Sequence, residues 1–178
     1  MIRLFVALEI PSPVCERLLA LQGGVSGARW LDREQLHLTL RFIGEVSEST
    51  AGDIDDALTG VRAPGFALAL AGVGAFGGKA PRSLWAGVRA SSELVHLQRK
   101  IEAALQRLGL SAEQRKFTPH VTLARLRDPP RAQVQEFLTT VALFSSGDFL
   151  VDGFALFSSE LASSGAIYRV ERNYPLAA

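Results

Sequence analysis

A four-residue pattern, His-x-Thr-Leu, occurs twice in the chain and constrains its fold more than any other feature. HLTL occupies residues 37–40 and HVTL residues 120–123, so one copy falls in each half of the 178 residues. Each copy is followed by a predicted helix and then by a pair of predicted strands, although the flanking residues do not repeat. This order predicts one domain, residues 1–178, built from two similar halves.

The spacing of apolar residues predicts a mixed chain of strands and helices. Strands are expected at residues 2–10, 28–31, 36–46, 66–73, 83–88, 117–126, 149–157 and 166–171. Helices are expected at about 12–22, 47–59, 92–108 and 130–141, with serine or proline at their starts and glycine after three of them. The strands at 66–73 and 83–88 are joined by the glycine-rich stretch AFGGKAPR, which is typical of a hairpin.

The two motifs offer the groups that an acid–base reaction at phosphorus needs. Side chains alternate along a strand, so His37 and Thr39 share one face, and His120 and Thr122 do the same. If the two halves pack about a two-fold axis, both imidazoles and both hydroxyls converge. One neutral and one protonated histidine can then act as base and acid near neutral pH, while the hydroxyls hold phosphoryl oxygens.

A single histidine in a strand is more often structural than functional, and the pairing is what changes the interpretation. The chain has three histidines, and two of them stand in the same four-residue pattern in matched halves. The third, His96, lies between Val95 and Leu97 on a predicted helix, with no neighbour that suggests a role. We therefore expect His37 and His120 to be catalytic and His96 to be structural or exposed.

These motifs resemble the 2H phosphoesterases, and in particular the LigT-like RNA 2′,3′-cyclic phosphodiesterases. The segments RLFVALEIP, HLTLRFIGEV, SLWAGV, FTPHVTLARL and IYRVERNYPL resemble that family's landmarks in the same order, nearly from end to end. The resemblance implies an α+β fold of two pseudo-symmetric lobes, each an antiparallel sheet with helices packed outside, and a catalytic cleft between them. It also implies hydrolysis of RNA 2′,3′-cyclic phosphate ends to a 2′-phosphate, with no cofactor and no metal.

The same resemblance suggests roles for individual residues. His37 would be the proton donor to the leaving 3′ oxygen and His120 the proton acceptor that activates water, while Thr39 and Thr122 would bind the phosphoryl oxygens. Phe42 and Arg125, each five residues after a histidine, match positions near the substrate. Five is an odd offset, so a regular strand would turn both away from the histidines unless a bulge intervenes.

Strict alternation offers Arg41 as a different phosphate contact. It is an even number of residues after His37 and would therefore lie on the histidine face. Its guanidinium is suited to bidentate contact with a phosphate.

Composition limits the partners and the location. A formal net charge of +1 predicts no bulk attraction to nucleic acid, so a basic site must be a local patch of the scattered arginines. Cys15 is the only cysteine, which excludes an intrachain disulfide and favours a reducing compartment. The N-terminal apolar run is too short for a signal peptide, and no segment is long enough to span a bilayer. We expect a cytoplasmic monomer, and the resemblance implies that it binds RNA ends with a 2′,3′-cyclic phosphate or cyclic nucleotides.

Three alternatives to hydrolysis without a metal remain open. The same site run in reverse would join a 2′,3′-cyclic end to a 5′-hydroxyl, as a 2′-5′ RNA ligase does. An RNA- or nucleotide-binding module without chemistry is a second possibility, against which the paired histidines argue. A metal hydrolase would need a third ligand such as Asp32 or Glu34, but neither has a recognised metal-binding spacing with the histidines.

Overall fold

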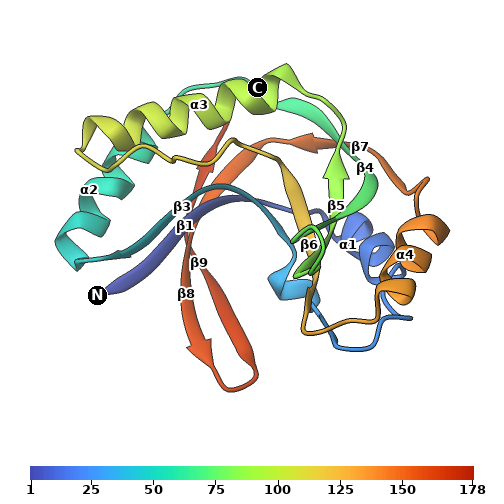
Figure 1. Ribbon diagram of the computed structural model, residues 1–178. Coiled ribbons are helices and arrows are strands. Elements are labelled where there is room, and N and C mark those ends of the chain that lie inside the picture. The colour runs from blue at the N-terminus through green and yellow to red at the C-terminus, as the bar shows by residue number, and fades with distance from the viewer.

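The computed structural model describes all 178 residues as an antiparallel sheet that curls, with four α-helices (Figure 1). The strands are β1 (Ile2–Glu9), β2 (Ala28–Trp30), β3 (His37–Val46), β4 (Phe66–Phe76), β5 (Ser83–Val88), β6 (His120–Leu126), β7 (Ser145–Val151), β8 (Gly153–Ala162) and β9 (Gly165–Pro175). The helices are α1 (Ser12–Leu19), α2 (Glu48–Thr59), α3 (Ser92–Arg107) and α4 (Arg131–Thr140), with a short 3₁₀ turn, η1 (Arg33–Gln35). The expected α+β class is confirmed.

The two histidine strands lie side by side in the middle of the sheet. The strand order is β7-β4-β5-β6-β3-β1-β8-β9, and β2 pairs with β6 outside this path. Strands β3 and β6 pair through Leu38 and Val121, the second residue of each motif. An antiparallel pair centred on equivalent residues has a local two-fold axis, so the two motifs are related as the sequence pattern predicts.

The strands that follow each motif cross to the other side of the sheet. β4 and β5 come after the first motif but lie beside β6, whereas β8 and β9 come after the second motif and lie beside β1. Each side of the sheet is therefore built from both halves of the chain. The division of residues 1–178 into two repeated halves stays a prediction about sequence order.

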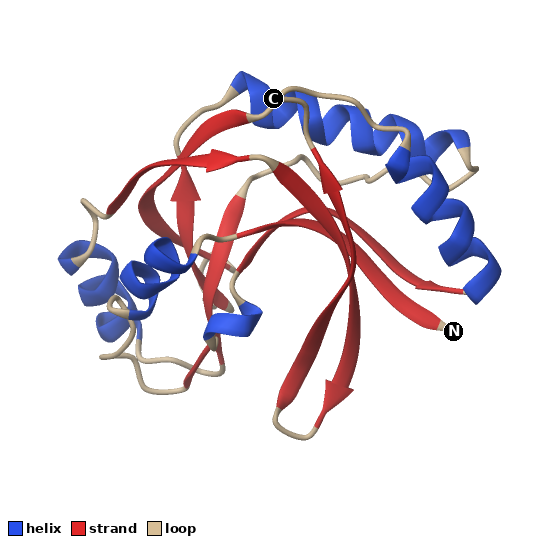
Figure 2. Cartoon of the chain, turned by 180° about the vertical axis from the view of Figure 1, so that it is seen from behind, coloured by secondary structure: helices blue, strands red, loops and turns tan.

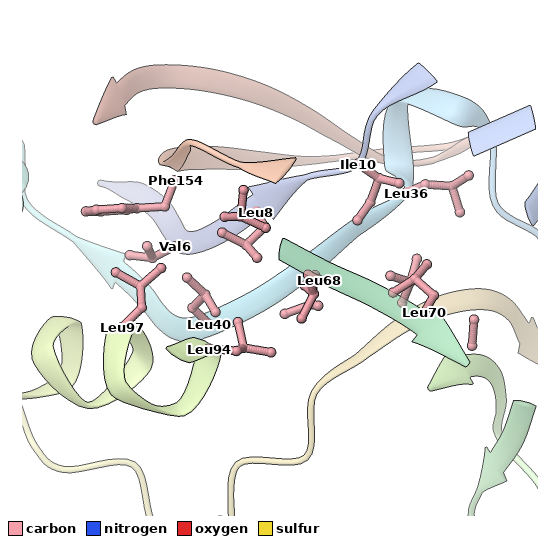
Figure 3. Close-up of a cluster of buried hydrophobic side chains, with 14 of the residues drawn as sticks. Val6, Leu8, Ile10, Leu36, Leu40, Leu68, Leu70, Leu94, Leu97 and Phe154 are labelled. Carbon is pink, nitrogen blue, oxygen red and sulfur yellow. The ribbon is translucent and has the colours of Figure 1, made fainter. Parts of the chain in front are cut away.

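One face of the sheet carries the main core. Leu38, Leu40, Val121 and Leu123 point into a cluster of 36 buried residues that includes side chains from all four helices. Figure 3 shows Leu94 and Leu97 of α3 directed toward Val6 and Leu40 of the sheet. The helices lie against this face in two groups. The view from behind shows one group, α2 and α3, separated by the strands from the other group, α1 and α4 (Figure 2). Because the helices cover one face, the other is left for the motifs' polar residues.

The expected single strand at residues 149–157 is wrong. The chain forms two strands there, β7 and β8, which pair with β4 and β1 at opposite ends of the sheet. Asp152 separates the two strands, and it is flanked by apolar residues that make the run look continuous. The second histidine strand is also shorter than expected, since it begins at His120 instead of residue 117. No helix combines the length and the apolar character needed to cross a bilayer.

Candidate active site

The polar residues of both motifs lie on one face of the sheet, opposite the main core; we call it the histidine face. Leu38 and Leu40 are almost completely buried, whereas His37 and Thr39 keep partial exposure, and the second motif repeats the pattern. The register that pairs Leu38 with Val121 aligns His37 with Thr122 and Thr39 with His120. The structure thus brings both imidazoles and both hydroxyls together, as predicted.

Each imidazole is held by a backbone carbonyl two residues before it. Nδ1 of His37 lies 2.7 Å from the carbonyl oxygen of Gln35, and Nδ1 of His120 lies 2.7 Å from that of Thr118. A carbonyl only accepts, so Nδ1 of both rings donates a proton. Nε2 is therefore the nitrogen left to exchange protons with a substrate, and it is so on both rings.

Burial and positive charge keep both histidines neutral in the free site. Burial lowers the pKa of His37 to about 4, and the charges of Arg125 and His120 act in the same direction against the hydrogen bond to Gln35. The pKa of His120 is also lowered, first by burial and then by Arg125, while its bond to Thr118 opposes the shift. Arg125 therefore lies close enough to act on both imidazoles.

Matching β-bulges return Phe42 and Arg125 to the histidine face. Val6 pairs with Arg41 and Ala7 with Thr39, so Leu40 has no partner on β1. In the same way Leu123 has no partner on β5. The extra residue shifts the alternation by one, so both residues at an offset of five from a histidine are exposed on its face.

The expectation that Arg41 lies on the histidine face is wrong. The bulge at Leu40 turns Arg41 to the core side, where its side chain is 9% exposed. Its Nε donates to Glu102 at 2.6 Å, and its Nη2 donates to the carbonyl of Ser111. Arg41 therefore ties β3 to α3 and to the loop before β6, and it is not available to a substrate.

Aromatic side chains that the sequence pattern did not predict as site residues surround both imidazoles. The ring of His37 lies 4.8 Å from Phe5 and 5.1 Å from Tyr168, between centroids. That of His120 lies 4.8 Å from Phe76 and 6.2 Å from Trp85. These residues come from strands far apart in the sequence, and Phe76 falls in a stretch predicted to be loop, so local patterns gave no signal for them.

The other sequence expectations are resolved by position. His96 is exposed on α3, in agreement with the expectation that it is structural or exposed. No group of three or more His, Cys, Asp or Glu side chains is arranged to hold a metal ion. Asp32 caps η1, where the side chain of Gln35 bonds its backbone N–H.

A curled antiparallel sheet with two matched His-x-Thr motifs on its open face defines a 2H phosphoesterase. The chain belongs to the 2′-5′ RNA ligase superfamily, whose family model matches residues 10–162.

Relatives of similar length extend over nearly the whole chain. It is 33% identical over 171 residues to the RNA 2′,3′-cyclic phosphodiesterase of Archaeoglobus fulgidus, covering 94% of this chain and 96% of that one. It is 34% identical over 175 residues to the protein of the same name from Thermotoga maritima, covering 94% and 92%. The crystal structure of Escherichia coli LigT complexed with 3′-AMP superimposes with a TM-score of 0.81 at 28% identity, covering 99% of each chain.

Proposed function

We propose that this protein hydrolyses RNA 2′,3′-cyclic phosphate ends to 2′-phosphates without a metal, using His37 and His120 as acid and base. The observation that carries the proposal is the pair of imidazoles on one sheet face, each with Nδ1 bonded to a carbonyl and Nε2 free. The names of its relatives support the RNA substrate, and the LigT complex with 3′-AMP supports a site that accommodates a nucleotide.

The reaction is an in-line displacement at phosphorus. Nε2 of His120 takes a proton from water as the water oxygen bonds to phosphorus. The bond from phosphorus to the 3′ oxygen breaks, and His37 gives that oxygen its proton. The product keeps the phosphate on the 2′ oxygen, and a proton exchange with solvent restores both histidines.

The hydroxyls and Arg125 stabilise the charge that builds on the phosphoryl oxygens. Thr39 and Thr122 flank the imidazoles and can donate to the two non-bridging oxygens. Arg125 reaches the same place from the bulge, and its guanidinium matches a phosphate. Phe42, 38% exposed with the Arg3 guanidinium 5.3 Å from its ring, offers an apolar surface to the terminal nucleoside.

Substrate binding adjusts the protonation of the site. A donor with a pKa of about 4 holds little proton at neutral pH. A phosphodiester anion between the imidazoles favours their charged forms and so raises the pKa of both histidines. We therefore expect His37 to take up its proton when the substrate binds. The protein is expected to act as a cytoplasmic monomer.

Product identity tests the proposal. The purified protein is incubated with an RNA ending in a 2′,3′-cyclic phosphate, with and without EDTA, and the 2′- and 3′-phosphate products are separated by chromatography. The proposal predicts a 2′-phosphate at the same rate in both samples. A 3′-phosphate product, unreacted RNA or inhibition by EDTA would each refute part of it.

A further inference from the structure

A basic pocket lies beside the histidine face and has no part in the mechanism above. It has a volume of about 470 Å³ and lies where the β4–β5 turn meets the corner between β6 and α4. Four cationic side chains line it, together with one carboxylate: Lys79, Arg82, Arg127, Arg131 and Asp128. The pocket thus carries a net charge of +3 in a chain whose formal net charge is +1, so the rest of the chain is net negative.

The cations of this basic pocket are free to bind an external anion. All four are exposed, and the ion pairs of the protein are made by other arginines. Asp128 therefore lies beyond ion-pair distance of each of them. Exposed cations grouped without partners raise the local positive potential, which attracts polyanions.

The backbone fixes the basic pocket next to the catalytic residues. The N–H of Leu126 donates to the carbonyl of Arg82 at 2.8 Å, and Ser83 pairs with Arg125 across β5 and β6. Arg127 follows Arg125 by two residues, about 7 Å along an extended chain. Phe76, whose ring contacts His120, immediately precedes the turn that carries Lys79 and Arg82.

Two glycines allow the turns around the basic pocket to approach closely. A Cβ on Gly77 would lie 2.3 Å from the carbonyl oxygen of Ala80, and one on Gly27 would lie 2.3 Å from that of Arg127. Both glycines have positive φ angles, of 111° and 77°. These positions exclude other residues, so the cations are held on a defined backbone.

We infer that the basic pocket binds the backbone phosphates of the RNA that precedes the cyclic end, so that the preferred substrate is an oligonucleotide. The inference rests on the proposed function, because only a nucleotide at the histidines fixes where the preceding phosphates lie. An RNA whose cyclic end lies at the histidines continues through the 5′ phosphate of its terminal nucleotide, and exposed Arg125 and Arg127, two residues apart at the end of β6, are placed to follow that chain into the basic pocket. Phosphate contacts of this kind add affinity without reading sequence.

The test compares two substrates. Steady-state kinetics are measured with a nucleoside 2′,3′-cyclic monophosphate and with an oligoribonucleotide ending in the same cyclic nucleotide, over a range of salt. In Arg82→Gln/Arg127→Gln, the ratio of kcat/KM for the oligonucleotide to that for the mononucleotide is expected to fall. Salt lowers kcat/KM for the oligonucleotide, and each phosphate contact on a single strand adds about 0.7 to the slope of its logarithm against the logarithm of the salt concentration. Losing two contacts should therefore make this salt slope shallower by about 1.4, which is a difference of about sevenfold in kcat/KM over a fourfold rise in salt.

The matched control is Arg99→Gln/Arg107→Gln, which removes two exposed, unpaired arginines from α3. It should keep the wild-type ratio and salt slope. An unchanged ratio in the Arg82/Arg127 variant, or an equal change in the control, would overturn the inference.

Binding separates this inference from the proposed function. Fluorescence anisotropy with an oligoribonucleotide ending in a 2′-phosphate needs no turnover, and the pocket variant should bind it more weakly than wild type. Equal affinities would overturn the basic pocket as an RNA site even if hydrolysis is intact. A wild-type protein that binds this RNA but hydrolyses neither substrate would instead refute the proposed function alone.

Discussion

Gly74 of β4 is the position where one added methyl group should disturb the active site without touching a catalytic residue. A Cβ there would lie 2.2 Å from Cζ2 and 2.3 Å from Cη2 of Trp85, whose ring crosses the glycine on the histidine face. Carbon atoms pack at about 3.5–4.0 Å, so the indole or the strand must move by more than about 1 Å. We expect Gly74→Ala to lower the free energy of unfolding by about 1–3 kcal/mol.

The same movement should slow catalysis. Trp85 pairs with Thr122 across β5 and β6, and its ring centroid lies 6.2 Å from that of His120. A misplacement of about 1 Å in a catalytic group costs on the order of 100-fold in rate. Since the shift is transmitted through Trp85, we expect Gly74→Ala to lower kcat by roughly 10- to 100-fold.

Three measurements test these effects. Urea unfolding followed by circular dichroism gives the free energy of unfolding, tryptophan fluorescence reports the surroundings of Trp85, and steady-state hydrolysis gives kcat. Gly52→Ala is the matched control, because Gly52 lies within α2 and a Cβ there meets no atom within 4 Å. It should stabilise the protein by up to about 1 kcal/mol and leave kcat unchanged. A Gly74→Ala protein with wild-type kcat and fluorescence would refute the proposed coupling of Trp85 to the site.

Three further predictions concern the motifs and their support. Thr39→Val and Thr122→Val should each raise the activation barrier by about 2–4 kcal/mol, measured as kcat, and a change below about twofold would leave the hydroxyls a structural role only. The plot of kcat/KM against pH should peak below pH 6.5, because the pKa of His37 and that of His120 are both lowered. Above the peak it should fall, because rising pH deprotonates the histidine that acts as the acid. The plot of kcat against pH should extend to higher pH, because the bound phosphate raises the pKa of both histidines. If kcat and kcat/KM had the same pH dependence, this expectation would be contradicted. Arg41→Met should lower the free energy of unfolding by about 3–5 kcal/mol in urea titrations, since it removes the counter-ion of the largely buried Glu102 carboxylate. Adding Glu102→Leu should recover part of this loss, and a cost below about 1 kcal/mol for Arg41→Met would contradict the account.

Local patterns predicted the parts of this protein that depend on local physics. The alternation of His37 and Thr39 with leucines correctly predicted that the first motif lies on a strand with its polar residues on the face opposite the core. Ser47 caps α2 and Ser91 caps α3, where helix starts were expected. The similarity of the two motifs led us to expect that they lie close together. The pairing of Leu38 with Val121 confirms this, because it makes β3 and β6 neighbouring strands.

Local patterns could not predict features that depend on contacts between residues distant in the sequence. The bulge at Leu40 depends on the register with β1, so strict alternation placed Arg41 on the wrong face. The break at Asp152 depends on which partner strands β7 and β8 pair with, on opposite sides of the two histidine strands. The aromatic contacts of Phe5 and Phe76 with the imidazoles likewise exist only once separate strands are adjacent.

The requirement for two histidines is tested most directly by removing them one at a time. Hydrolysis of RNA 2′,3′-cyclic phosphate is measured for His37→Ala, His120→Ala and, as the control, His96→Ala, after circular dichroism has shown that each variant is folded. Losing one proton-transfer group should lower kcat by about 10²- to 10⁴-fold in either motif variant, while His96→Ala keeps wild-type activity. Full activity in a folded His37→Ala or His120→Ala protein would contradict the two-histidine mechanism.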